Sequence, residues 1–150
     1  MPTGEQLLWS TRGLYNLLRR HEKGDLSREA ALDRLTDVFW DLNADGGARI
    51  TNLSTSSAQY VWKMSFSAER IADEALRDPN ATDREVGLAL RLKAAIAQTR
   101  IYLMFRDDWK EVMAGASKLG DLTEETIPPI IEQHVESGAL DKGDVPDDYR

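Results

Sequence analysis

The stretch from Thr82 to Leu119 constrains the fold more than any other part of this sequence. Thr82 and Glu85 have the spacing of a capping box, in which the two residues satisfy backbone N–H groups at a helix N-terminus. Apolar residues then recur at helical spacing, and on more than one side, between Leu88 and Phe105. The sequence therefore predicts one very long helix that begins at Thr82.

Two apolar stripes run along this predicted helix. The first contains Val86, Leu90, Ala94, Ala97, Ile101 and Phe105, and the second contains Leu88, Leu92, Ala95, Ile96 and Leu103. Arg84, Arg91 and Gln98 form a narrow polar line between them. Because a helix that is apolar all round is typical of a buried position, we expect both stripes to be buried and the helix to lie at the centre of a bundle.

The length of the predicted helix creates a packing problem. It would extend for about 50 Å at 1.5 Å per residue, whereas its predicted neighbours would extend for about 25 to 33 Å. We expect either a break near residues 106–108 or a second half that leaves the bundle. Four apolar residues lie in that second half: Trp109, Val112, Met113 and Ala116. A fifth helix or a second copy of the chain must therefore cover them.

Four further helices are predicted from capping residues and apolar spacing. They cover about residues 3–21, 27–44, 54–77 and 123–136. Thr3 and Ser27 are the N-caps of the first two, and residues 54–57 offer several N-caps for the third, of which Ser56 with Gln59 fits a capping box. A loop from Asp45 to about Leu53 follows the second helix. No segment alternates with period two, so we expect an all-α, single-domain bundle of about five helices over residues 1–136, with a long, largely buried fourth helix. The remaining residues, 137–150, are expected to form a loosely ordered acidic tail.

Composition excludes several classes of function. The chain contains no cysteine, which excludes a disulfide framework, a thiolate nucleophile and the Cys-rich classes of zinc site. Its net charge of −7, from 26 acidic and 19 basic residues, argues against general affinity for a nucleic-acid backbone. No apolar run has the length of a membrane span or of a signal-peptide core. We therefore expect a cytoplasmic protein without direct nucleic-acid or membrane binding.

The segment from Asp41 to Gly46 resembles the first half of the calcium-binding loop of EF-hand and dockerin proteins. In such loops alternating oxygen-bearing side chains converge on a hard cation, and a glycine allows the sharp turn. The resemblance implies the ligand set Asp41, Asn43, Asp45, Gly47 and Asn52. The segment departs from the family pattern at Asn52, where a bidentate Glu is usual, and at Ala48, where a branched apolar residue is usual.

The same residues also fit a polar helix C-terminus. Asn, Asp and Gly are favoured in turns and in left-handed backbone conformations, with no metal involved. A ligand set with so few oxygens would bind calcium weakly, because calcium prefers six to eight of them.

Aromatic residues on the third predicted helix form another candidate site. Tyr60, Trp62 and Phe66 lie largely off its main apolar stripe. Because Tyr and Trp are favoured at protein interfaces, these residues either contact a partner or cover the edge of the bundle as core. A further alternative is a small-ligand pocket between helices, lined by Trp62, Arg100 and Tyr102.

Arg100 lies beside Ile101 and Leu103 in the apolar middle of the long helix. If Arg100 is buried, it needs a carboxylate partner such as Asp73 or Asp107. In a cavity it would bind an anionic ligand, and otherwise its guanidinium group extends to the surface.

No Gly-rich phosphate loop, nucleophile elbow or metal-spaced histidine pair is present in the sequence. We therefore expect a non-enzymatic interaction or regulatory module that binds a copy of itself or another protein. The interface or ligand candidates are Tyr60, Trp62, Phe66, Arg100, Tyr102, Trp109, Val112 and Met113. The alternatives are a weak calcium-binding helical protein and a small-ligand-binding bundle with a pocket near Arg100.

Overall fold

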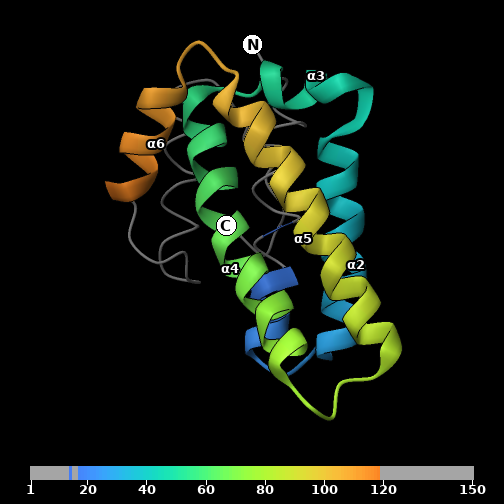
Figure 1. Ribbon diagram of the computed structural model, residues 1–150. Coiled ribbons are helices and arrows are strands. Elements are labelled where there is room, and N and C mark those ends of the chain that lie inside the picture. Colours follow the sequence, from blue (N-terminus) through green and yellow to red (C-terminus); the bar gives the residue numbers. More distant parts are fainter. Residues whose placement is uncertain (1–13, 15–16, 119–150) are drawn as a thin grey trace, which may run out of the picture.

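The computed structural model describes residue 14 and residues 17–118 (Figure 1). Within this part every regular element is a helix, and no strand occurs. The labelled helices are α2 (Arg28–Leu42), α3 (Ala44–Asn52), α4 (Thr55–Arg77), α5 (Asp83–Met104) and α6 (Trp109–Lys118). Residues 17–22, which precede α2, are also helical. The prediction of an all-α bundle is confirmed.

Hydroxyl side chains start three of these helices. Ser27 Oγ accepts a hydrogen bond from the Ala30 N–H at 3.2 Å, and Thr82 Oγ1 accepts one from the Glu85 N–H at 3.1 Å. Both N-caps are as predicted, because this side-chain bond satisfies a donor that has no partner inside the helix. For α4 the cap is Ser54, one of the several candidates at residues 54–57, and the capping box of Ser56 with Gln59 is not the one used.

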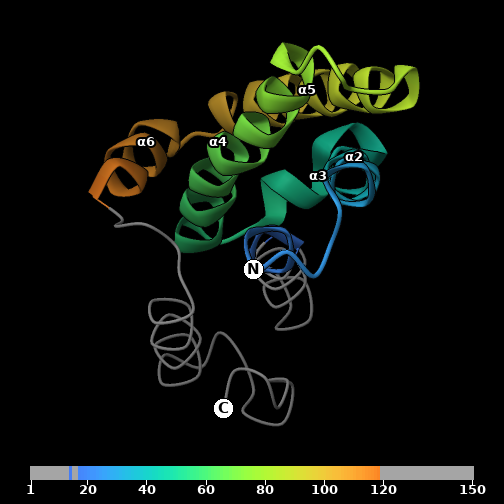
Figure 2. The same ribbon diagram turned by 90° about the horizontal axis from the view of Figure 1, so that it is seen from below.

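Helix α5 packs against both α2 and α4, and it also contacts α3 (Figures 1 and 2). The side chains that it buries are Leu88, Ala89, Leu92, Ala95, Ile96, Thr99 and Leu103. This set contains the whole of the second predicted stripe. The core of the described bundle therefore lies between α5 and the helices that precede it, as expected for the fourth predicted helix.

The first predicted stripe of α5 is not buried, which corrects the expectation that both stripes face the core. Leu90 is 56% exposed, Ile101 is 44% exposed and Phe105 is 81% exposed. The reason is that α2, α3 and α4 contact α5 where it buries Leu88, Leu92 and Ile96, and these contacts leave the first stripe exposed. An apolar stripe is buried only if a neighbouring helix covers it. The spacing of its residues does not show whether such a helix is there.

The predicted break is confirmed. Helix α5 ends at Met104, and α6 begins at Trp109 after a turn in which the Trp109 N–H donates to the Arg106 carbonyl at 3.2 Å. Helix α6 packs on α4 and buries Val112 there. The predicted fifth helix lies outside the described residues, so the expectation that this helix or a second copy covers the segment stays a prediction.

The loop predicted after the second helix contains a short helix, α3. Asp45, Gly46 and Gly47 all have positive φ angles, of 56°, 67° and 82°, and they turn the chain from α2 into α3. The sequence predicted a loop from Asp45 to about Leu53, because Asn, Asp and Gly are turn residues. In the structure the turn takes only residues 45–47.

The remaining predictions fall outside the described part of the chain. These are the cap at Thr3, the helix at 123–136, the tail at 137–150 and the domain boundary between the last two. None of the described helices has the combination of length and apolar character that crossing a membrane requires.

Candidate interaction surface

An exposed apolar row runs along the side of α5 that faces away from α2 and α4. It consists of Leu90, Ala94, Ala97, Ile101, Met104 and Phe105, and we call it the outer face of α5. Met104 is 52% exposed, a fraction similar to those of Leu90 and Ile101. Spacings of three and four residues place these side chains in one line of about 22 Å. The outer face is therefore a continuous apolar surface without a charged side chain.

Carboxylates of α4 hold two cations beside the outer face. Lys93 Nζ lies 2.6 Å from Asp73 Oδ1, and Arg100 Nη1 lies 3.1 Å from Glu69 Oε1. The hydrogen bond to Asp73 raises the pKa of Lys93, because it favours the charged ammonium. These two pairs neutralise one edge of the outer face and connect α5 to α4.

Three of the predicted site residues meet at this edge. The rings of Trp62 and Phe66 are in edge contact, with centroids 5.5 Å apart and planes at 72°. Arg100 Cζ lies 4.0 Å from the Phe66 centroid and 5.9 Å from that of Trp62. Such cation–π contacts hold the guanidinium group against the rings.

The sequence suggested Asp73 or Asp107 as the carboxylate partner of Arg100. In the structure the partner is Glu69. Asp73 is already paired with Lys93. Arg100 Nε also donates to Ser65 Oγ at 3.1 Å, and the side chain is only 18% exposed. Its Nη2 is buried and has no hydrogen-bond partner among the described residues. Arg100 therefore does not extend freely into solvent.

Exposed aromatic side chains also lie on both neighbouring helices. Phe66 of α4 is 46% exposed, and Arg100 places it directly beside α5. Trp40 of α2 is 42% exposed and lies two turns after Asp33, which pairs with Arg84 of α5 at 3.9 Å. The outer face of α5 is thus flanked by the exposed ring of Phe66 on the α4 side.

The other aromatic and apolar candidates have different positions. Tyr60 is buried in the core, and burial raises the pKa of its phenol. Tyr102 lies on the opposite side of α5 from Arg100 and packs over Gly47 of α3. The predicted pocket residues Trp62, Arg100 and Tyr102 are therefore not brought together. On α6, Val112 is buried against α4, Met113 is partly buried and Trp109 is 38% exposed.

The five candidate calcium ligands are largely engaged elsewhere. Asn43 is buried, donates through Nδ2 to the Ala95 carbonyl at 3.0 Å, and accepts through Oδ1 from Thr99 Oγ1 at 2.7 Å. It therefore joins the end of α2 to the middle of α5. The side-chain oxygen Oδ1 of Asn43, which would have to bind calcium, faces the core instead.

The remaining calcium candidates do not converge. Asp41 Oδ2 pairs with Arg49 Nη1 at 2.9 Å, and the Gly47 carbonyl accepts from Thr51 Oγ1 at 3.2 Å. Asp45 and Asn52 are exposed at opposite ends of α3. In the part of the chain that the structure describes, no three Asp, Glu or His side chains form a group that would hold a metal ion.

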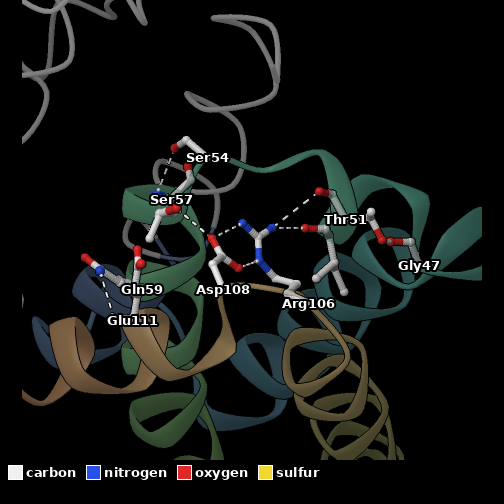
Figure 3. A network of polar contacts seen from close by, with 10 residues as sticks. Gly47, Thr51, Ser54, Ser57, Gln59, Arg106, Asp108 and Glu111 are labelled. Atoms are coloured by element: carbon white, nitrogen blue, oxygen red, sulfur yellow. Dashed lines mark hydrogen bonds and ion pairs between the residues drawn. The ribbon is translucent and has the colours of Figure 1, made fainter.

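A polar network fixes the junction between α5 and α6 (Figure 3). Arg106 Nε and Nη2 donate to the two carboxylate oxygens of Asp108 at 2.8 and 2.9 Å. Arg106 Nη1 donates to the Ile50 carbonyl at 2.5 Å, near the end of α3. Asp108 also accepts from Thr55 Oγ1 at 2.6 Å, in the first turn of α4. Four helices are therefore joined through one bidentate ion pair.

The electrostatics of this junction follow from that pair. Hydrogen bonds from Arg106, with a smaller contribution from Thr55, lower the pKa of Asp108 to about 2. The Arg106 side chain is only 8% exposed, so the guanidinium group and the carboxylate depend on each other. The sequence identified residues 106–108 only as the place where the long helix breaks. The residues next to Arg106 in the sequence do not show that its side chain contacts residues more than fifty positions away.

The outer face of α5 is the main candidate site that the sequence did not identify as exposed. Five of its six residues, all except Met104, belong to the first predicted stripe, but that stripe was expected in the core. Both stripes recur at helical spacing, so spacing alone does not show which of them the neighbouring helices cover.

Comparisons with known proteins do not assign the chain to a family. No family model, curated protein or solved structure matches it. The function must therefore be argued from the geometry of this chain.

Proposed function

We propose that this protein is a helical interaction module that binds a protein partner through the outer face of α5. The observation that carries the proposal is the exposure of four large apolar side chains in one row: Leu90, Ile101, Met104 and Phe105. Contiguous apolar surface of this kind is typical of interaction sites, because water solvates it poorly. Burial of each half-exposed side chain would contribute roughly 1 kcal/mol to binding.

The chemistry of the surface supports binding rather than catalysis. The outer face itself carries no ionisable or nucleophilic side chain, and the two cations along its α4 edge, Lys93 and Arg100, are held by Asp73 and Glu69. Phe66 adds an exposed ring at the edge next to α4. An apolar centre with aromatic and charged residues at the rim is the common composition of a protein interface.

Affinity capture from the native cell with matched variants tests the proposal. Ala97→Glu places a charge at the centre of the outer face, and Ala114→Glu makes the same change at an exposed position of α6. We expect the first variant to lose the captured protein, including any captured copies of the chain itself, and the second to retain it. Circular dichroism and thermal melting should show that both variants fold. Equal capture by both folded variants would contradict the proposal.

A further inference from the structure

We infer that a second copy of this chain covers the outer face, with the two α5 helices packed antiparallel about a two-fold axis close to Ala97. This inference rests on the proposed function, since it names the partner of the same surface. The arguments are the order of large and small side chains along the face and the charges at its ends.

Two small side chains, Ala94 and Ala97, lie between Leu90 and Ile101, so that the centre of the face is complementary to itself when reversed. With the two-fold axis between residues 97 and 98, the two Ala97 residues are adjacent, Ile101 lies opposite Ala94, and Phe105 lies opposite Leu90. Each bulky side chain then meets a small one at the centre, and the two helix axes approach evenly. A two-fold interface requires this self-complementarity, because the same residues contribute from both sides.

A parallel pair of α5 helices fits less well. In that arrangement Ile101 would meet Ile101, and Ala94 would meet Ala94. The bulky residues would hold the helices apart and leave a void at the alanines, which close-packed protein interfaces avoid. Antiparallel helices also place the positive end of each helix dipole near the negative end of the other.

Charges at the two ends of the outer face favour the same arrangement. Arg91 and Asp107 are both exposed, and neither makes an ion pair within residues 17–118. Arg91 follows Leu90, and Asp107 lies just beyond Phe105, the residue that faces Leu90 across the axis. The antiparallel register therefore brings Arg91 of each copy close to Asp107 of the other, and the symmetry makes this pair twice.

Disulfide trapping tests the register directly, because the chain has no cysteine of its own. Ala97→Cys should form a covalent dimer under mild oxidation, since the two residues face each other across the axis. Ala94→Cys should not form one, because the two positions lie about 10 Å apart along the axes, which exceeds the reach of a disulfide. An equimolar mixture of Ala94→Cys and Ile101→Cys should form the mixed dimer. Ala114→Cys, on α6, controls for random collisions.

Charge reversal provides a second measurement on the uncrosslinked protein. Asp107→Arg should raise the dimer dissociation constant roughly 3- to 10-fold, because it places two cations together at each end. Adding Arg91→Asp should restore the wild-type value, since the pair is then reversed but intact.

The inference is overturned if Ala97→Cys crosslinks no faster than Ala114→Cys, if Ala94→Cys crosslinks as readily as Ala97→Cys, or if the charge-reversed double variant does not recover. If these tests fail while Ala97→Glu still abolishes capture of another protein, only the second copy is wrong as the partner. If capture is also unaffected by Ala97→Glu, the proposed function falls with it.

Discussion

Gly47 sets how closely α3 approaches α5. Its φ angle is +82°, and a Cβ added there would lie 2.6 Å from Cγ of Tyr102. Real Cβ atoms do not approach a ring carbon so closely, so only glycine allows the Tyr102 ring to cover the backbone at this point. The neighbouring Gly46 also has a positive φ, of +67°, but an added Cβ there would meet nothing within 4 Å.

These two glycines give a matched pair of substitutions. Gly46→Ala should destabilise the fold by about 1 kcal/mol, from backbone strain alone. Gly47→Ala should cost roughly 2–4 kcal/mol, because overpacking against Tyr102 adds to the same strain. Urea unfolding of both variants measures the difference. Equal losses of stability would show that the ring moves away without cost and that the close approach is not needed.

At the residue scale the sequence predicts local features better than distant ones. The caps at Ser27 and Thr82 follow from hydrogen bonds to residues three positions on, which a sequence displays directly. The role of Asn43 could not be predicted, because its partners Ala95 and Thr99 lie more than fifty positions away. Its position among turn residues instead suggested a calcium ligand.

At the scale of the elements, the sequence predicted where the long helix breaks between α5 and α6. It did not predict the contacts that hold the chain at this junction. The sequence placed a break near Arg106 because a helix of the full length would exceed its neighbours. The structure adds the reason that the break is well defined: Arg106 and Asp108 hold the turn between the end of α3 and the start of α4.

This junction should contribute to acid sensitivity. The pKa of Asp108 is about 2 in the folded chain and near 3.8 for an unperturbed aspartate. The unfolded state therefore binds the proton more readily, so the contribution is fully present above about pH 4 and is lost as the pH falls towards 2. We expect it to amount to about 1–2 kcal/mol after allowance for the partial exposure of the carboxylate.

Asp108→Asn checks this expectation. The variant should be less stable than wild type at pH 6, and the difference should shrink between pH 4 and pH 2 when unfolding by urea is followed across that range. Asp37→Asn removes an exposed carboxylate of α2 and serves as the control for net charge. A stability difference for Asp108→Asn that stays constant down to pH 2 would exclude the proposed coupling to Arg106.

At the scale of the whole molecule, the all-α class and the bundle could be predicted, but the covered side of α5 could not. The stripe through Leu92 and Ile96 lies against α2 and α4, whereas the stripe through Leu90 and Ile101 faces outward. Helical spacing records which residues share a side. Which side meets a neighbour depends on how three helices are arranged in space, and a single sequence does not contain that arrangement in its local pattern.

The central claim is that the outer face of α5 is an interface between two copies of the chain, and sedimentation equilibrium over a range of concentrations tests it most directly. Wild type and Ala114→Glu should approach twice the mass of the chain as concentration rises. Ala97→Glu should remain at the mass of one chain throughout. A wild-type protein that stays at the mass of one chain at the highest concentration, or an Ala97→Glu variant that associates as wild type does, would contradict the account.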